Sequence, residues 1–175
     1  MNLIVDIGNT RTKVAVFDND AIVEQWVYNH ITKECISSIT QIYPISKAIV
    51  SSVGKEENWQ NILSDLPRYI ELSSHLKLPI TNMYKTPNTL GADRIAGVVG
   101  ATVLFPNRHN LVIDMGTCIT LDFVTNTGEY KGGAILPGIS MKFKALHTFT
   151  NKLPLLSIEN FVDNDFFIGD DTQSS

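Results

Sequence analysis

The sequence predicts an α/β fold in which mixed sheets are flanked by helices and two related domains share the chain. Three observations predict it. Short apolar runs with strand character alternate with stretches of helical spacing, as in α/β proteins. Three strands precede a helix, a strand and a second helix, an order that indicates a sheet with both antiparallel and parallel neighbours. The opening residues recur near residue 110 of the 175, which indicates an internal duplication.

The start of the chain predicts three antiparallel strands joined by tight turns. Residues 3–5 and 13–18 are apolar runs on either side of a turn at residues 8–11. Asn19 and Asp20 supply a second turn before the apolar run at 22–27. Because Gly, Asn and Asp are the usual turn residues, these segments are expected to form successive hairpins.

Beyond residue 30 the apolar spacing becomes helical. The residues with this spacing are Ile31, Cys35, Ile39 and Ile42, which predict a helix that ends at Pro44. A buried strand is expected at 47–52 and a helix with one polar face at 56–66. A loop bounded by Pro79 and Pro87 follows. Apolar residues at helical spacing then predict a helix from about 93 to 105.

The second half of the chain begins like the first. At an offset of 108 residues, six identities fall within fifteen positions. The identical pairs are Asn2/Asn110, Leu3/Leu111, Asp6/Asp114, Gly8/Gly116, Thr12/Thr120 and Val16/Val124. Such self-similarity indicates two related units. We therefore expect an N-terminal domain at 1–105 and a second domain at 106–175.

Composition excludes several classes of protein. Hydrophobic residues make up 43% of the chain and charged residues 18%, so a packed core is expected and disorder throughout is not. The formal net charge of −4 argues against a nucleic-acid partner bound through a broad basic face. No apolar run approaches the ~20 residues of a membrane helix, and no signal peptide is visible. Cys35 and Cys118 are too few for a disulfide framework. A cytoplasmic protein without a membrane partner is expected.

Each half carries a loop suited to phosphate. An apolar strand ends in Asp6 or in Asp114, a glycine follows two residues later, and a threonine hydroxyl comes next, at Thr10 or Thr117. Glycine lets backbone amides approach a ligand, hydroxyls donate to phosphate oxygens and carboxylates hold a cation. The Walker and G-x-G-x-x-G patterns are absent from the sequence. Asp-x-Gly can also be turn chemistry alone, but two copies in matching context favour a nucleotide with its metal.

Three segments together carry a resemblance to a known family. They are Asp6-Ile7-Gly8-Asn9-Thr10-Arg11-Thr12-Lys13, Gly91-Ala92-Asp93-Arg94 and Asp114-Met115-Gly116-Thr117. The duplicated loops resemble those of the acetate kinase, sugar kinase and actin superfamily. Within it, the sequence is similar to the type III pantothenate kinases, which phosphorylate pantothenate to 4′-phosphopantothenate at the start of coenzyme A synthesis. The resemblance implies two ribonuclease H-like domains that close over ATP.

The resemblance also implies roles for particular residues. The ATP-binding set would be Asp6, Ile7, Gly8, Asn9, Thr10, Arg11, Thr12, Lys13 and Thr117, with Asp6 near the Mg²⁺ that accompanies ATP. Asp114 would help to hold a monovalent cation, K⁺ or NH₄⁺. The pantothenate site would contain Tyr84, Gly91, Ala92, Asp93, Arg94 and Thr172. Asp93 would be the catalytic base.

These roles suit phosphoryl transfer, which depends mainly on positioning and charge stabilisation. A carboxylate such as Asp93 that accepts the proton of a primary hydroxyl contributes roughly 10²–10⁴-fold. The planar guanidinium of Arg94 could pair with the carboxylate of pantothenate. On sequence alone, Asp93 could equally be an acid that favours a helix N-terminus beside a solvated Arg94, and Tyr84 could be a surface anchor.

The match breaks at the end of the chain. Members of the family continue past the position of Thr172, where a helix is expected to begin. We therefore expect a C-terminally truncated second domain, present as a fragment, as part of a longer chain or as a naturally short gene, with weak or absent kinase activity if the chain is complete. The resemblance implies a homodimer. Two alternatives stay open: a non-catalytic transcriptional accessory protein, and a kinase or phosphatase for another small hydroxy acid.

Overall fold

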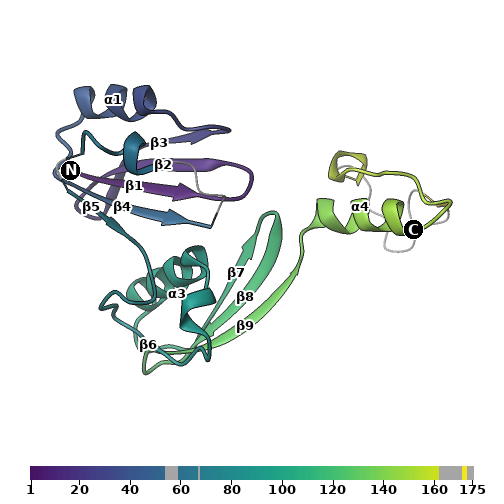
Figure 1. Cartoon of the computed structure of the whole chain (residues 1–175). Coiled ribbons are helices and arrows are strands. Elements are labelled where there is room, and N and C mark those ends of the chain that lie inside the picture. Colours follow the sequence, from purple (N-terminus) through teal and green to yellow (C-terminus); the bar gives the residue numbers. More distant parts are fainter. Residues whose placement is uncertain (54–58, 67, 162–170, 173–175) are drawn as a thin grey trace. The chain divides into compact units, whose positions relative to one another are not determined.

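The computed structural model describes residues 1–53, 59–66, 68–161 and 171–172. Its first sheet contains β1 (Asn2–Ile7), β2 (Thr12–Asp18), β3 (Ala21–Tyr28), β4 (Lys47–Ser52) and β5 (Tyr69–Glu71), in the order β3-β2-β1-β4-β5. Its second sheet contains β6 (Thr81–Asn82), β7 (Asn110–Met115), β8 (Cys118–Val124) and β9 (Glu129–Pro137), in the order β6-β9-β8-β7. Helices flank these sheets (Figure 1). The predicted α/β class with mixed sheets is confirmed.

The first sheet is mixed in the way that the sequence predicts. β1 pairs antiparallel with β2, and β2 pairs antiparallel with β3. β4 then lies parallel to β1 on its other side, and β5 lies parallel to β4. The three-residue strand β5 is too short for a periodic pattern, so the sequence did not predict it.

One face of this sheet carries the core of the first half. Alternate residues of β1 and β2 point to this face and are buried, together with apolar residues of α1 (Lys33–Ile42) and of the segment after α2 (Trp59–Ile62). The fully buried members from these strands and from α1 are Leu3, Val5, Val14, Val16 and Ile36. Figure 1 shows α1 lying across this sheet. The core explains the alternation of buried and less buried residues along the first two strands.

The first two predicted helices differ from the sequence expectation at their ends. α1 begins after Thr32, whose side-chain oxygen accepts a hydrogen bond from the N–H of Cys35, so Ile31 is buried just before the helix. The helix expected at 56–66 is α2, which ends at Ile62; residues 56–58 lie outside the described residues. The chain turns after Ile62 because Leu63 and Leu66 enter the core.

The predicted helix at 93–105 is α3 (Ala92–Leu104), which contacts β4. The loop predicted before it contains the two-residue strand β6 and a 3₁₀ turn, η1 (Pro87–Thr89). From the sequence, the glycines of this helix are expected to let it pack closely against another element. A Cβ added at Gly100 would meet no atom within 4 Å, whereas close packing occurs at Gly91, just before the helix.

The internal duplication extends to the element bounds. β7 begins and ends 108 residues after β1, and β9 begins 108 residues after β3. α4 (Ile139–Phe149) follows β9 as α1 follows β3, and η2 (Ile158–Phe161) comes later. The same order of three strands and a helix therefore occurs twice, which supports the predicted repeat.

Residue contacts divide the chain into two compact units. The first contains Met1–Leu111 and Asp122–Gly132, and the second contains Val112–Leu121 and Gly133–Ser175. These two units are defined by contacts between residues. The expected domain boundary after residue 105 stays a prediction.

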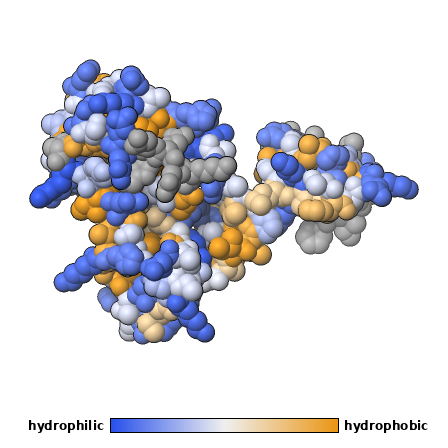
Figure 2. Space-filling view, viewed as in Figure 1, coloured by the Kyte–Doolittle hydropathy of each residue, from blue (hydrophilic) through white to orange (hydrophobic). Residues whose placement is uncertain are grey.

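Large apolar side chains are exposed in both units. Those of the second unit with more than half of their surface exposed include Ile113, Met115, Ile135, Leu146 and Phe149. Figure 2 shows apolar and polar patches side by side on the face in view. None of the helices in the described part of the chain has the length and apolar character needed to span a bilayer.

Candidate functional site

The first Asp-x-Gly loop joins β1 to β2 at one edge of the first sheet. The Gly8 N–H donates a hydrogen bond to the Arg11 carbonyl oxygen at 3.1 Å, and a Cβ at Gly8 would come within 3.1 Å of that same oxygen. Glycine is therefore needed to keep this turn tight. Ile7 and Thr12 are each 5% exposed, so of the predicted ATP-binding residues these two offer a ligand little beyond their backbone.

Asp6 lies between a cationic and a hydroxyl side chain on one face of the sheet. Its cross-strand partners are Lys13 on β2 and Ser51 on β4, and directly paired residues share a face. Ser51 is 7% exposed, and its Oγ has no hydrogen-bond partner among the described residues. A buried hydroxyl without a partner is costly, so this position is suited to an oxygen-rich ligand or its water.

The start of α3 holds the predicted catalytic carboxylate. Asp93 Oδ1 accepts a hydrogen bond from the Arg94 N–H at 2.8 Å, which places the half-buried carboxylate on the first turn of the helix. This oxygen occupies the space that a Cβ at Gly91 would need. The backbone of Gly91 has an ordinary conformation, so the absence of a side chain, not backbone freedom, is what glycine supplies.

Val53 links this helix start to the first loop. Its N–H donates to the Ile7 carbonyl oxygen at 3.0 Å, and its Cγ1 lies 3.6 Å from the Cβ position of Gly91. β1 and β4 are parallel and both end here. The carboxyl edge of parallel strands is the usual ligand site of open α/β sheets.

A pocket of about 410 Å³ opens at the same edge. Its lining includes several hydroxyl-bearing residues and two of the predicted substrate residues, Gly91 and Ala92. The polar members are Ser52, Ser73, Ser74, His75, Asn88 and Thr89. This volume falls within the range of roughly 300–1,000 Å³ typical of small-molecule sites. The sequence analysis did not identify these serines, because nothing local distinguishes them from loop residues.

Arg94 enters a buried ion pair with Asp122 of β8. Arg94 is 6% exposed and Asp122 1%. The Arg94 Nε lies 2.9 Å from Asp122 Oδ1 and 3.1 Å from Oδ2, and Nη2 lies 2.6 Å from Oδ1. The hydroxyl of Tyr130, on β9, donates to the same Oδ1 at 2.6 Å. Hydrogen bonding to Asp122 raises the pKa of Arg94, and burial followed by the bond to Asp122 raises the pKa of Tyr130.

The sequence did not predict this partner of Arg94, and the expected role of Arg94 toward a substrate carboxylate stays a prediction. The planar fork expected to face a substrate carboxylate has its Nε and Nη2 bonded to Asp122. The physical reason is burial, because a guanidinium removed from water requires an anionic partner. Asp122 was missed, although an acid in the apolar strand at 118–124 was a usable signal, since buried acids are almost always paired.

Tyr84 packs against this ion pair. The Arg94 Cζ lies 5.5 Å from the Tyr84 ring centroid, and the rings of Tyr84 and Tyr130 are stacked at 6.1 Å with an interplanar angle of 9°. A Cβ at Gly132 would come within 3.3 Å of the Tyr84 ring, and Gly132 has a φ of +94°. The predicted substrate residues Tyr84 and Arg94 are therefore in contact with each other.

The second loop, Gly116 and Thr117, belongs to the second unit. The Gly116 N–H donates to the Cys118 carbonyl oxygen at 2.9 Å, and the Gly138 N–H donates to the Thr117 carbonyl oxygen at 3.1 Å. A Cβ at Gly138 would collide with the carbonyl oxygens of Gly116 and Thr117. Since α4 begins after Gly138, the helix start and the second loop are tightly joined.

Two further predicted residues lie in the second unit. Asp114 is exposed on β7, one strand position before the end, and Thr172 is exposed in a turn. The predicted site residues thus divide by unit, with the first loop, Tyr84 and residues 91–94 in one and Asp114, Thr117 and Thr172 in the other.

The side-chain oxygens near the two loops suit cations that are held mostly by a bound ligand and only partly by the protein. The described residues contain no group of three or more His, Cys, Asp or Glu side chains that could form a metal site by themselves. Mg²⁺ is commonly held by one or two carboxylates, waters and substrate phosphates. Asp6 beside the unpartnered Ser51 hydroxyl fits that pattern, and the exposed carboxylate of Asp114 is an oxygen ligand that suits K⁺.

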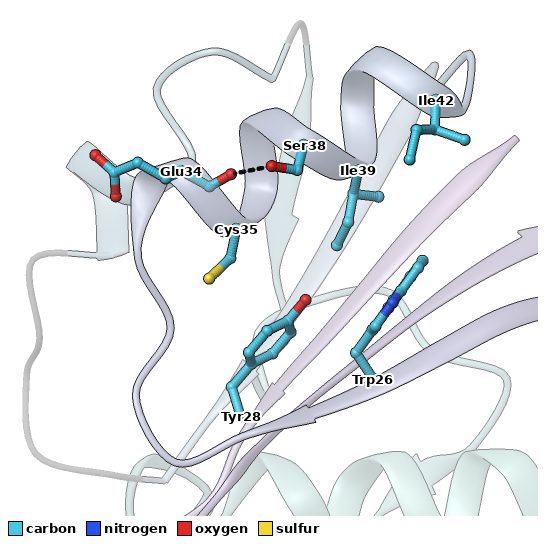
Figure 3. A pocket seen from close by; sticks show the side chains of 7 residues that line it. All are labelled: Trp26, Tyr28, Glu34, Cys35, Ser38, Ile39 and Ile42. Carbon is cyan, nitrogen blue, oxygen red and sulfur yellow. Dashed lines mark hydrogen bonds between the residues drawn. The ribbon is translucent and has the colours of Figure 1, made fainter.

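A second pocket, of about 340 Å³, lies between β3 and α1. Figure 3 shows the rings of Trp26 and Tyr28 on the strand side, facing Cys35 and Ile39 of the helix. None of the predicted site residues lines this pocket.

Comparison with solved structures agrees with the fold. A Sinorhizobium meliloti protein described as a 2-dehydro-3-deoxygalactonokinase superposes with a TM-score of 0.51 at 11% identity, covering 86% of this chain and 58% of that one. The two chains therefore share an α/β fold of mixed sheets with flanking helices.

Comparison of sequences narrows the class. The model of the type III pantothenate kinase family matches residues 2–175. The type III pantothenate kinase of Phocaeicola vulgatus is 46% identical over 164 residues, which cover 93% of this chain and 68% of that protein. The enzyme of the same description from Bacteroides fragilis is 44% identical over 177 residues, covering 100% of this chain and 72% of that protein. The chain belongs to the type III pantothenate kinase family.

Proposed function

We propose that this protein transfers the γ-phosphoryl group of ATP to the primary hydroxyl of pantothenate, which forms 4′-phosphopantothenate in the first step of coenzyme A biosynthesis. The observation that carries the proposal is the position of Asp93, on the first turn of a helix beside the pocket lined by Gly91 and Ala92. Val53 joins this helix start to the first phosphate loop. Membership of the family supports the choice of acceptor.

In this proposal the first loop holds the ATP phosphates. The exposed side chains of Asn9, Thr10, Arg11 and Lys13 offer donors to phosphate oxygens, while Ile7, Gly8 and Thr12 are proposed to shape the loop. We assign Asp6 to the Mg²⁺ that ATP carries, with Ser51 as a neighbouring oxygen. When bound, this metal would neutralise charge on the transferring phosphoryl group.

Asp93 is assigned as the base. As the hydroxyl oxygen of pantothenate bonds to the γ-phosphorus, its proton passes to the Asp93 carboxylate and the bond from phosphorus to the bridging oxygen of ADP breaks. The hydrogen bond that the Arg94 N–H donates to Asp93 Oδ1 keeps the carboxylate oriented. Gly91 and Ala92 line the acceptor pocket, while Tyr84, Arg94 and Thr172 are proposed to complete the substrate contacts.

The second unit is proposed to supply the remaining contacts with ATP and the cation. Thr117 would donate to ATP from the start of the second loop, and Asp114 would hold K⁺ or NH₄⁺. The α4 start that packs on this loop through Gly138 supports a phosphate role, because helix N-termini favour anions.

A homodimer and a cytoplasmic location are parts of the same proposal. The exposed apolar residues near the end of α3, Val103, Leu104 and Phe105, and those of β7, support association with a second copy. Light scattering of the purified chain would give a mass twice that of the 19.4 kDa protomer if the dimer forms.

The test is turnover by the purified chain. We expect ADP release and a phosphorylated product, identified by mass spectrometry, when ATP, Mg²⁺ and pantothenate are combined with K⁺ or NH₄⁺. Other small hydroxy acids in place of pantothenate should give much less. Preferential turnover of another acid would assign a different acceptor. Tight pantothenate binding without ADP release, even with ATP present, would contradict the kinase proposal and favour a non-catalytic protein.

A further inference from the structure

The chain contains a buried polar cluster in which two members, Asp122 and Tyr130, have no assigned role. It consists of Arg94 on α3, Asp122 on β8 and Tyr130 on β9, with Tyr84 packed against them, and all four lie in the first unit. Asp122 Oδ1 accepts three hydrogen bonds, two from Arg94 and one from Tyr130. Such a fully satisfied network in a dry environment is rigid.

The cluster is joined to the proposed base by the backbone. Arg94 follows Asp93 directly, and the Arg94 N–H donates to Asp93 Oδ1 at 2.8 Å. The same residue therefore contacts the Asp93 carboxylate through its backbone and the Asp122 carboxylate through its side chain. Any rotation of the first turn of α3 that moved Asp93 would have to disturb the bonds of 2.6–2.9 Å between Arg94 and Asp122 Oδ1.

The cluster also confines Tyr84. Its ring is bounded by the Arg94 guanidinium, by the stacked ring of Tyr130 and by Gly132, where a Cβ would come within 3.3 Å of the ring. The Tyr84 N–H donates to Asn82 Oδ1 at 3.0 Å, which fixes the backbone of the same residue. Tyr84 is thus held in place by packing on its faces and by a backbone bond.

We propose that Asp122 is a positioning residue for the acceptor site: through Arg94 it sets the place of Asp93 and of the Tyr84 ring, and Tyr130 supports it. The proposal rests on the function proposed above. In addition to its proposed substrate contact, Arg94 then holds other groups in place, because its Nε and Nη2 are bonded to Asp122. Orientation of this kind is valuable, since a misplacement of about 1 Å can cost about 10²-fold in rate.

The variant Tyr130→Phe tests the proposal without removing a charge. It deletes the hydroxyl bond to Asp122 and keeps the ring that stacks on Tyr84. Tyr43→Phe is the matched control, because it also removes a hydrogen bond from a tyrosine to a carboxylate, that of Glu24, at the end of α1. We expect Tyr130→Phe to lower kcat/KM for pantothenate by about 10-fold, within the cost of a misplaced group, with KM for ATP unchanged. Tyr43→Phe should change neither constant.

Hydrogen exchange supplies a readout that does not depend on turnover. Tyr130→Phe should speed amide exchange in the peptides that cover residues 81–94, and leave those of β1 and β2 unchanged. Asp122→Asn should show the same pattern more strongly if it folds. Absence of ADP release by the parent chain would overturn the proposed function, while faster exchange confined to 81–94 would still support the positioning role. Unchanged exchange there, or equal changes in KM for ATP and for pantothenate, would overturn it.

Discussion

The carboxylate of Asp93 occupies the space that a Cβ atom on Gly91 would need. These two residues stand at the start of the same helix, two positions apart. Since Gly91 has a backbone conformation that other residues adopt readily, a side chain at this position would conflict mainly with the observed position of the Asp93 carboxylate. The sequence Gly-Ala-Asp-Arg therefore encodes a particular position of one acidic side chain.

The variant Gly91→Ala should displace this carboxylate. We expect kcat for pantothenate phosphorylation to fall roughly 10- to 100-fold, because the base is moved from its working position, while KM for ATP stays the same. Gly100→Ala in the same helix is the control, since its new Cβ meets nothing within 4 Å. That control should raise stability by about 0.5–1 kcal/mol, as expected for alanine in a helix interior. Equal turnover in the two variants would contradict the prediction.

Asp93→Asn should separate catalysis from folding. The amide retains an oxygen that can accept the Arg94 N–H, so we expect thermal unfolding to change little. Turnover should fall roughly 10²–10⁴-fold, the contribution of general base catalysis. Steady-state kinetics and a melting curve on the same preparation check both parts. Turnover at the parent rate would remove Asp93 as the base.

Gly138→Ala should disturb the second loop. The added Cβ would meet two backbone carbonyl oxygens, those of Gly116 and Thr117, and backbone atoms cannot move aside cheaply. We expect a loss of about 1–3 kcal/mol in the free energy of unfolding, typical of overpacking, and a raised KM for ATP. Denaturant unfolding and ATP titration are the measurements. A fall in stability with an unchanged KM for ATP would leave Gly138 with a structural role only.

Alkaline pH should weaken the buried cluster. The pKa of Tyr130 is raised from its ordinary value of 10.0, so the folded protein favours the neutral phenol. The stabilisation is therefore complete below about pH 10 and is lost as pH rises from there toward the folded pKa. We expect the Tm of the parent chain to fall more steeply above pH 10 than that of Tyr130→Phe. Parallel melting profiles of the two proteins between pH 8 and 11 would contradict this expectation.

Much of the fold could be predicted because its signal is local. The apolar runs of β1 and β2 and the helical spacing in α1 follow directly from the faces that these elements bury. The repeat at an offset of 108 residues was visible in six identities, and it holds for the bounds of β1 and β7 and for the first residues of β3 and β9. The end of α2 was not predictable in this way, because Leu63 and Leu66 leave the helix to fill a core formed by distant strands.

The candidate site was harder to predict where it depends on tertiary partners. The motifs identified the first loop and residues 91–94 because glycine and acid are informative at short spacing. The partner of Arg94 lies 28 residues away on strand β8, and no local pattern connects the two. The pocket serines at 52, 73 and 74 come from separate segments, and only the fold brings them to one edge.

The two copies of the repeat differ at the turn between their first two strands. Four residues, 8–11, join β1 to β2, whereas only Gly116 and Thr117 join β7 to β8. Duplication first gives two equivalent copies, and a difference of two residues in the length of this turn makes the copies unequal. The longer turn can place its own amides around a charged group. The shorter turn is supported by the hydrogen bond that the Gly138 N–H donates to the Thr117 carbonyl oxygen. We therefore expect that a protein with the two turns exchanged would not be active, because each copy depends on a turn of its own length.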